Sequence, residues 1–264
     1  MKKYYLVARN MWDEMLTYRL NFTMWRVRNV FQLLTIYFLW YALIPQNSSF
    51  AGYTRAEMLT YILATVLASA IVTSTQTGNI GDEINSGDLS NFLLRPINMF
   101  KYWLAKDFGD KAMNISFSIV ELSLIFILLH PPLFIQSNLL FLVATIFSLL
   151  VAVMEYFFFS LLLGFIGFWS SETWAPRFIF SIILSFFAGG LFPLDILPKP
   201  IFLFVQFLPF TYMVYFPVKI YLGQLSFLAI LQGLAISLLW VGVLFAFAKM
   251  VWNRGLQVYA AQGR

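Results

Sequence analysis

Long apolar stretches alternate with short polar segments along most of the chain. Six of them are close to the roughly 20 residues that a helix needs to cross the hydrocarbon core of a membrane. They cover residues 29–44, 58–77, 112–129, 139–169, 178–197 and 227–252. The first is short, and its helix could begin as early as Met24. The fourth would measure roughly 46 Å, so we expect it to tilt, to bend near Gly164 and Gly167, or to extend beyond the membrane.

Two further segments do not fit a spanning helix. In residues 4–22, apolar side chains recur on one helical face and polar side chains on the other, which predicts an amphipathic helix lying in the membrane surface. Residues 198–223 are apolar but rich in proline, and irregular backbone at membrane depth must be enclosed by protein. We therefore expect a re-entrant helical hairpin there, although part of it could instead form a seventh span. The residues that would shape it are Gly189, Gly190, Pro193, Pro198, Pro209 and Pro217.

The composition requires a membrane setting. Hydrophobic residues make up 61% of the 264 residues and charged residues only 11%, with a mean hydropathy of +0.79. Soluble domains carry roughly 25% charged residues, so a water-soluble protein is excluded. Six spans would use most of the length, so residues 1–264 should form a single all-α integral membrane domain. The chain has no cysteine, which excludes disulfides and thiolate metal sites.

The positive charge is distributed as membrane orientation requires. The net charge is +5, but the basic residues lie in loops and termini rather than in one patch. With six spans and the amino terminus inside, only Arg55, Lys199 and Lys219 fall outside. Inside segments of membrane proteins carry the excess of lysine and arginine. We therefore expect both termini in the cytoplasm and no nucleic-acid partner.

Residues 78–106 form the most informative polar segment, a cytoplasmic loop between the second and third spans. Asp82 and Glu83 suit the first turn of a short helix, and Gly87 can end that helix. Asp88 can cap the next turn. The apolar face of the loop comprises Ile84, Leu89, Phe92 and Leu93. Such a face either binds a partner or packs beneath the chain's own helices, and the sequence leaves both open.

Two carboxylates lie inside expected spans, Glu121 in the third and Glu155 in the fourth. A charge at the membrane centre costs at least about 2.5 kcal/mol on insertion scales. Such residues line a substrate path or transfer protons, or they are structural groups bonded to a neighbouring helix. Both interpretations remain open. If the two carboxylates line a path, they favour a cationic substrate.

The chain lacks the motifs of common catalytic and nucleotide sites. No G-x-x-x-x-G-K-[S/T] phosphate loop is present, so ATP cannot bind through one. His130 is the only histidine, which excludes the usual zinc sites. Its place beside Pro131 suits a polar cap at the outer surface rather than a catalytic base. We expect a non-catalytic membrane subunit with no cofactor or metal of its own.

Several segments, taken in order, resemble the permease subunits of type-2 ATP-binding-cassette (ABC) exporters, in the branch with six spans and a separate ATPase. An amphipathic amino-terminal helix precedes the first span. The other similar segments are residues 84–89 and 93–96 in the coupling loop, 187–198 at the fifth span and re-entrant turn, 208–210 and 215–223 in the outer hairpin, and 252–263 in the carboxy-terminal tail. The resemblance thus covers nearly the whole chain.

The resemblance implies one half of an exporter in a bacterial inner membrane. Two permeases, identical or related, would each contact one copy of a cytoplasmic ATPase, on which ATP and Mg²⁺ would bind. Dimerisation of the two ATPase copies would push the coupling loop and open a path between the permeases. The implied transmission surface comprises Asp82, Glu83, Ile84, Gly87, Asp88, Leu89, Leu94, Arg95 and Pro96.

Two other functions fit the sequence less well. A proton-coupled secondary transporter could use Glu121 and Glu155, but such proteins often contain an internal repeat and none is visible. A membrane-embedded enzyme acting on lipids needs polar side chains that converge at one interface, and the outer loops hold few. The sequence does not specify the substrate, since drugs, lipids, peptides and hydrophobic cations all suit an apolar, aromatic interior.

Overall fold

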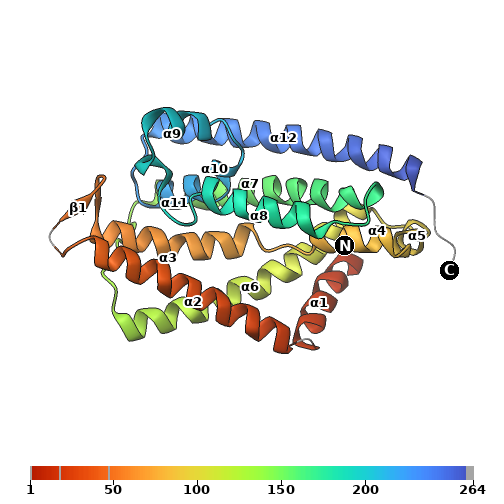
Figure 1. The fold of residues 1–264 in the computed structure, drawn as a ribbon, viewed down its shortest axis with the longest axis horizontal. Coiled ribbons are helices and arrows are strands. Elements are labelled where there is room, and N and C mark those ends of the chain that lie inside the picture. The colour runs from red at the N-terminus through yellow and green to blue at the C-terminus, as the bar shows by residue number, and fades with distance from the viewer. Residues whose placement is uncertain (1, 18, 47, 260–264) are drawn as a thin grey trace.

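The computed structural model describes residues 2–17, 19–46 and 48–259. Its α-helices are α1 (Lys2–Thr17), α2 (Arg19–Leu43), α3 (Arg55–Val72), α4 (Ile80–Asn85), α5 (Asp88–Leu93), α6 (Met99–Leu129), α7 (Leu139–Gly164), α8 (Trp174–Phe187), α9 (Lys199–Val205), α10 (Phe210–Met213), α11 (Tyr215–Tyr221) and α12 (Phe227–Val258). The 3-10 turns are η1 (Thr77–Asn79), η2 (Phe165–Phe168) and η3 (Leu194–Ile196), and the strands are β1 (Ser49–Phe50) and β2 (Tyr53–Thr54). The long helices run along the longest axis, with the β-hairpin at one end and α4 and α5 at the other (Figure 1). We call these the hairpin end and the α4–α5 end.

Four helices of the described chain are long and apolar enough to cross a membrane: α3, α6, α12, and α7 continued by η2. The fourth and sixth predicted spans are close to the observed Leu139–Phe168 and Phe227–Val258. The fourth span changes from α-helical to 3-10 geometry after Gly164, within the region where a bend was expected. The third span begins at Met99 rather than at 112. The stretch 101–111 carries charged residues but continues the same helix. The second ends at Val72 rather than at 77.

The six-span count is not confirmed, because the first and fifth predicted spans do not meet the same criterion. α2 is 25 residues long, but three arginines fall in its first half. α8 has 14 residues and so rises only about 21 Å, less than a hydrocarbon core of about 30 Å. Its apolar sequence continues, but Gly189 at a φ of +76° turns the chain.

The amino-terminal helix differs in length from the predicted one over residues 4–22. α1 ends at Thr17 and α2 begins at Arg19, while Tyr18 lies outside the described residues. α1 is steeply inclined to the long helices (Figure 1) and crosses α6 so closely that a Cβ on Gly109 would clash with the carbonyl oxygen of Ala8. A position in the membrane surface stays a prediction.

The chain is all-α as predicted, apart from one two-stranded antiparallel hairpin with the pairs Ser49↔Thr54 and Phe50↔Tyr53. Its two turn residues, Ala51 and Gly52, have φ values of 51° and 85°, the left-handed conformation that tight hairpin turns require. Thr54 then caps α3, and the Glu57 side chain accepts a bond from the Thr54 backbone in return, as in a capping box.

Between α8 and α12 the chain forms η3 and three short helices rather than a simple pair. Pro198 precedes α9, Pro209 precedes α10, and Pro217 lies in the first turn of α11, where the missing N–H is tolerated. Figure 1 shows α9 to α11 toward the hairpin end. α11 is buried against α7 and α3. Whether this region is re-entrant in a membrane stays a prediction.

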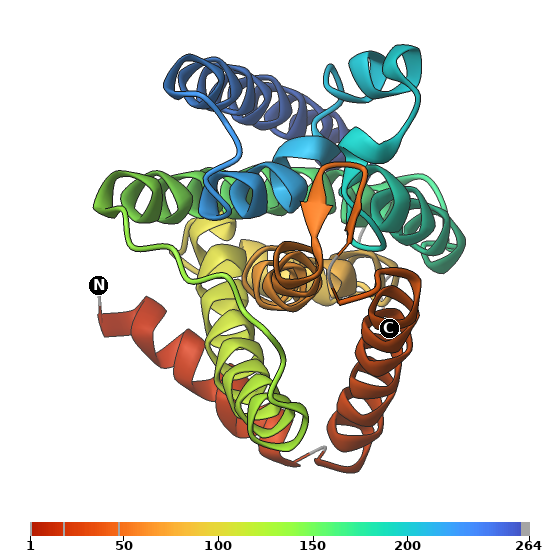
Figure 2. The same cartoon turned by 90° about the vertical axis from the view of Figure 1, so that its left-hand side faces the viewer.

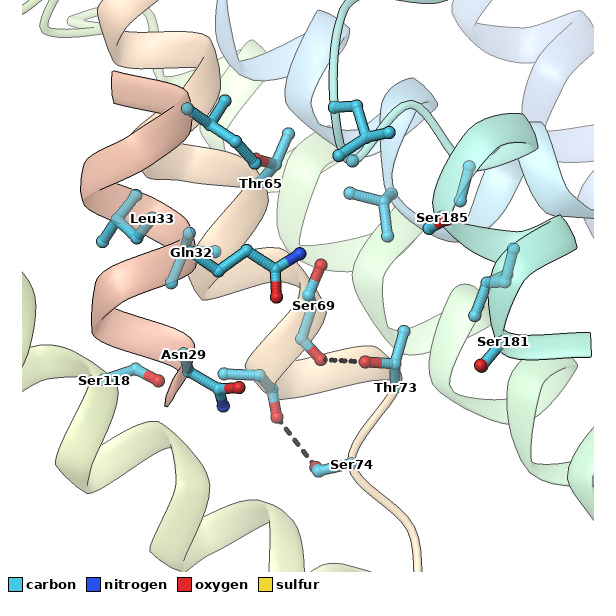
Figure 3. Close-up of a pocket in the computed structure, with 18 of the residues that line it drawn as sticks. Asn29, Gln32, Leu33, Thr65, Ser69, Thr73, Ser74, Ser118, Ser181 and Ser185 are labelled. Atoms are coloured by element: carbon cyan, nitrogen blue, oxygen red, sulfur yellow. Dashed lines mark hydrogen bonds between the residues drawn. The ribbon is translucent and has the colours of Figure 1, made fainter. Parts of the chain in front are cut away.

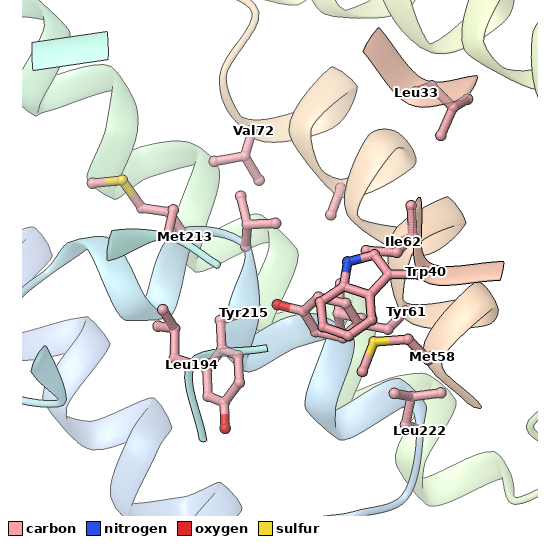
Figure 4. Packing of buried hydrophobic residues seen from close by; sticks show 14 of the residues in the cluster. Leu33, Trp40, Met58, Tyr61, Ile62, Val72, Leu194, Met213, Tyr215 and Leu222 are labelled. Carbon is pink, nitrogen blue, oxygen red and sulfur yellow. The ribbon is translucent and has the colours of Figure 1, made fainter. Parts of the chain in front are cut away.

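The two largest of three apolar clusters hold most of the described helices together. One surrounds Tyr61, Tyr215 and Leu194 and includes Trp40 of α2 (Figure 4). The other surrounds Trp103 of α6 and Trp252 of α12 toward the α4–α5 end, with ring centroids 5.2 Å apart in an edge-to-face arrangement, the geometry that aromatic pairs prefer. The first cluster holds α2, α3 and α8 together, and the second holds the helices together at the α4–α5 end.

Candidate functional site

A groove of about 390 Å³ lies between α2 and α8. In the end-on view both helices lie on the same side of the central α3, one above the other (Figure 2), and α3 lines the groove between them. We call it the α2–α8 groove. Polar side chains from all three helices line it, as the close-up shows (Figure 3). They are Asn29, Gln32, Thr65, Ser69, Thr73, Ser74, Ser181 and Ser185, with Ser118 from α6.

The hydroxyl groups of this groove are compatible with apolar helices because they bond to their own backbone. Thr73 donates to the carbonyl of Ser69 at 2.9 Å and Ser74 to that of Ala70 at 2.8 Å. Ser181 and Ser185 donate in the same way to carbonyls of α8, each at 2.7 Å. Each hydroxyl oxygen keeps lone pairs that can accept a bond from a molecule in the groove.

A buried ion pair forms one side of the groove. Arg26 of α2, 6% exposed, donates from Nε to Glu121 Oε1 of α6 at 2.6 Å and from Nη2 to Glu121 Oε2. The same guanidinium donates to Asn114 at 3.3 Å and Ser118 at 3.1 Å. A bidentate pair of this kind is the strongest arrangement for arginine and carboxylate. Glu121, predicted as a possible path residue, therefore lines the groove with its charge already neutralised.

The ion pair also borders a second cavity on the other side of α2. This cavity, of about 440 Å³, lies between α2 and α6 and is mainly apolar, with Phe31 and Phe117 exposed on its rim. Arg26 and Glu121 contribute to the lining of both cavities. The pair is therefore the polar partition between them.

Glu155 does not belong to the same site as Glu121. It is 0% exposed between α7 and α12, where Ser237 donates to its Oε2 at 3.1 Å. Its Oε1 has no hydrogen-bond partner among the described residues. Glu155 lines neither cavity, so the structure gives no support to a cationic substrate attracted by these two carboxylates.

The predicted coupling loop divides into a buried part and an exposed part. Ile84 and Leu89 are 5% and 0% exposed, packed in the chain's own aromatic cluster. Leu93 and Leu94 are 42% and 86% exposed at the end of α5. One part of the segment thus packs beneath the chain's own helices and the other stays exposed, and its binding to a partner stays a prediction. Of the residues in the implied transmission surface, Asp82, Asp88, Arg95 and Pro96 are also exposed.

Glu83 and Gly87 shape this loop from within. Glu83 pairs with Lys106 of α6 at 3.1 Å. Trp103 also donates to the Glu83 carboxylate, at 3.4 Å. Gly87 adopts a φ of +83° between α4 and α5, and its carbonyl accepts a bond from Tyr259 at 3.1 Å. The loop is therefore anchored to α6 and to the residue that follows α12.

α4 is also joined to the helix that lines the groove. Arg177 of α8 donates from Nη1 to the carbonyl of Gly78 and lies 3.9 Å from Asp82. Beside it, the backbones of α4 and η2 touch without intervening side chains, since a Cβ on Gly167 would lie 2.8 Å from the Cα of Gly81. α4 and the turn before it are therefore in direct contact with η2 and α8.

A buried polar network fixes the segment between α3 and α4. Asp107 of α6 accepts bonds from the Thr75 hydroxyl at 2.7 Å and from the Gln76 N–H at 2.9 Å. Lys111 lies 3.7 Å from Asp107 and donates to the carbonyls of Val72, at 3.1 Å, and Ser74. Lysine at a helix carboxy terminus satisfies unpaired carbonyls and complements the helix dipole. The end of α3 is thus tied to α6.

A further charged cluster lies at the hairpin end. Lys219 of α11, 5% exposed, donates to Asp195 at 2.8 Å, to the Tyr53 hydroxyl at 2.7 Å and to Gln224. Tyr53 in turn donates to Asp195 at 2.8 Å. Burial raises the pKa of the Tyr53 phenol well above its ordinary value, and Asp195 raises it further. Tyr53 therefore stays a donor, and the cluster joins α11, η3 and β2.

The sequence analysis missed the roles of Arg26, Arg177 and Lys219, which it counted only as charges that set orientation. A signal was present for Arg26, since apolar residues surround it on both sides. If the first span begins at Met24, as the sequence allows, Arg26 lies inside a helix, where a charge needs a partner. Its partner lies 95 positions away, which no local pattern indicates.

The re-entrant residues contact the groove at one point. Gly190 lines it, and the preceding Gly189 accepts a bond from the Tyr61 hydroxyl at 2.6 Å. The other residues predicted to shape the hairpin, Pro193, Pro198, Pro209 and Pro217, do not line it.

Comparison with known proteins agrees with this architecture. A family model described as "ABC-2 family transporter protein" matches residues 30–263. No curated protein matched the chain. The matched region includes most of the groove, the coupling loop and all of α12, and it covers well over half of the sequence. The chain therefore belongs to the ABC-2 transporter family.

Proposed function

We propose that this chain is the permease subunit of an exporter driven by ATP hydrolysis on a separate cytoplasmic ATPase. Membership of the ABC-2 transporter family identifies it as a multi-pass membrane protein of an ABC transporter, in a family whose members are generally non-catalytic membrane components. In the complete exporter, two ATPase copies carrying ATP and Mg²⁺ act on two permeases, which are two copies of this chain or this chain with a related one.

The observation that carries the proposal is the link between α4 and α8. The exposed residues Leu93 and Leu94 offer an apolar contact for an ATPase. α4 belongs to the same loop and is in direct contact with the elements beside it. Gly81 touches the backbone at Gly167, and Arg177 of α8 bonds to Gly78. A push on this loop therefore reaches α8, one of the helices that line the α2–α8 groove.

The α2–α8 groove is the proposed path. Its lining includes several hydroxyl and amide side chains, in a protein whose exposed helix surfaces are largely apolar. Its open side lies between α2 and α8, so a second permease facing the same side would close it. The ion pair of Arg26 and Glu121 fixes one wall, which leaves α8 as the wall that α4 can move.

The orientation follows from the basic residues. Lys3, Arg95, Lys101 and Lys106 belong to α1 and to the segment from α5 to α6, and these elements lie at the α4–α5 end (Figure 1). Because cytoplasmic segments carry the positive excess, this end faces the cytoplasm with both chain termini. We place the protein in a bacterial inner membrane.

The test is co-purification of the tagged chain from its native membrane in mild detergent. A stoichiometric protein with a phosphate-loop motif, identified by mass spectrometry, is the expected companion. Leu94→Asp should remove it, because a charge replaces an apolar contact that is 86% exposed. Val258→Asp is the matched control, a charge at another exposed apolar position at the same end.

Two results would contradict the proposal. One is a chain that carries no ATPase in any mild detergent. The other is transport in vesicles that depends on a proton gradient and not on ATP, as the proton-coupled alternative requires. The geometry does not favour that alternative, because Glu121 is paired with Arg26 and Glu155 lies outside the groove.

A further inference from the structure

The α2–α8 groove changes character along its length. Toward the α4–α5 end its lining is polar, with Arg28 and Asn29 from α2 and Thr73 and Ser74 following α3. Toward the hairpin end it is mainly aliphatic, although Thr65 and Ser185 also lie there. The aliphatic side chains are Leu33, Ile36, Ile62, Val66, Leu191 and Val214. A molecule that fills the groove must therefore carry a polar part and an apolar part.

The charge in the groove is positive. Arg26 and Glu121 neutralise each other. Arg28 is exposed and makes no ion pair or hydrogen bond with any described residue. The groove therefore presents one free cation and no free carboxylate. A cationic head would be repelled there, whereas a neutral or anionic head would not.

The hydrogen-bonding groups of the groove favour a head with hydroxyl groups. The hydroxyl hydrogens of Thr73, Ser74 and Ser181 are engaged with their own helices, so their oxygens offer acceptors. Asn29 and Gln32 add amides that both donate and accept. A polyol or glycosyl head supplies O–H donors to the hydroxyl oxygens and acceptors to the amides. A quaternary ammonium head supplies neither.

We infer that the substrate of the α2–α8 groove is an amphiphile with a hydroxylated head, neutral or anionic, and an aliphatic tail. The head lies toward the α4–α5 end and the tail toward the hairpin end. The volume of about 390 Å³ is within the range of small-molecule pockets, about 300–1,000 Å³. This inference rests on the proposed function, in which the groove is the path.

The test uses the absence of cysteine, which lets a single introduced thiol report on the groove. Ser69→Cys marks its polar half and Val66→Cys its apolar half. Ser116→Cys, exposed on α6 and outside the groove, is the control. Each variant is labelled with N-ethylmaleimide in lipid nanodiscs, together with the ATPase with which it purifies. The probes are dodecyl maltoside, dodecyl phosphate and dodecyltrimethylammonium, each below its micelle concentration.

Dodecyl maltoside should slow labelling at both groove positions, by roughly tenfold at about ten times its apparent Kd, and leave Ser116→Cys unchanged. Dodecyl phosphate should also protect, and dodecyltrimethylammonium should not. Arg28→Gln should weaken protection by the phosphate roughly tenfold and leave that by the maltoside unchanged. Arg254→Gln, which removes an exposed arginine of α12 far from the groove, should change neither.

The inference is overturned if the cationic probe protects as well as the maltoside, or if no probe protects thiols that react freely. In either case an ATPase that still co-purifies leaves the proposed function standing. Loss of the ATPase association, by contrast, would count against the proposed function and not against the chemistry of the groove, because the labelling reports only on the thiols of this chain.

Discussion

Arg177 on α8 donates a hydrogen bond to the main-chain carbonyl of Gly78, 99 positions earlier in the chain. The same side chain bonds through Nε and Nη2 to the carbonyl and hydroxyl of Thr173, both at 2.9 Å. Its guanidinium is thereby held in one orientation, with the segment before α4 on one side and α8 on the other. The connection between loop and spanning region depends on a single side chain at this point.

Arg177→Gln should uncouple ATP hydrolysis from transport while leaving the complex assembled. Glutamine is too short to reach Gly78, and a hydrogen bond from a charged group contributes about 1.5–3 kcal/mol. The measurement is ATPase activity of the reconstituted complex with and without a transported amphiphile. We expect stimulation to fall severalfold, with Arg254→Gln unchanged. Full stimulation in Arg177→Gln would show that force passes by another contact.

Gly167→Ala should destabilise the contact between α4 and η2. The new Cβ would lie 2.8 Å from the Cα of Gly81 and 2.9 Å from its carbonyl oxygen, and forcing extra atoms into a packed interface costs about 1–3 kcal/mol. Gly242→Ala is the control, because nothing lies within 4 Å of its added Cβ. It should be neutral or slightly stabilising, since alanine favours a helix by about 1 kcal/mol over glycine. Thermal unfolding in detergent compares the two, and equal midpoints would contradict the close contact.

The ion pair between Arg26 and Glu121 should behave as a unit. Removing one partner leaves a buried charge without compensation, which costs about 3–5 kcal/mol, whereas replacing both with apolar residues is often close to neutral. Arg26→Met and Glu121→Met should each lower thermal stability strongly, and the double variant should recover most of the loss. If the double variant lost as much as the sum of the two, the residues would act independently.

Lys219→Met should loosen the hairpin end more than Tyr53→Phe. Lysine bonds directly to Asp195, Tyr53 and Gln224, and its removal leaves the Asp195 carboxylate without its cation. Tyr53→Phe removes one donor and leaves the pair of Lys219 and Asp195 intact. Limited proteolysis between α8 and α12 provides the measurement. Equal protection of the two variants would mean that Lys219 does not hold this region.

Glu155→Gln should retain transport. Glutamine has the same size, can still accept from Ser237 and removes an isolated buried charge. We expect ATPase stimulation and stability close to those of the unmodified chain. A complete loss of transport in an assembled complex would return Glu155 to the mechanism and support proton coupling.

The sequence predicted well those helices whose apolar runs have clear limits. α7 follows Asn138 and α12 follows Ser226, and both residues cap the first turn with their side chains. It failed where a helix leaves the apolar region without ending. α6 continues back through Lys111, Asp107, Lys106 and Lys101 to its cap at Asn98. Lys111 and Asp107 find partners in the segment after α3, Lys106 pairs with Glu83 of α4, and Lys101 stays exposed.

Of the site, the sequence indicated the coupling loop and Glu121, but not the groove. Local patterns show that Ile84 and Leu93 share an apolar face, yet not that one is buried and the other exposed. The hydroxyl groups at Ser69, Thr73 and Ser181 looked like ordinary residues of apolar helices. They become a polar lining only because α2, α3 and α8 meet around them, and that arrangement depends on contacts between distant parts of the chain.

In the proposed exporter, the backbone contact between Gly81 and Gly167 determines how much of a movement of α4 reaches η2. A contact made by side chains can absorb part of a movement through changes of rotamer. Substituting one residue for another can also alter how much of the movement it transmits. A contact between bare backbones lacks this compliance, so in the proposed exporter a movement of α4 reaches η2 with little loss, and the lengths of α4 and α5 set its size. A longer or shorter displacement would therefore require adding or removing residues in α4 and α5 rather than changing the contact between Gly81 and Gly167.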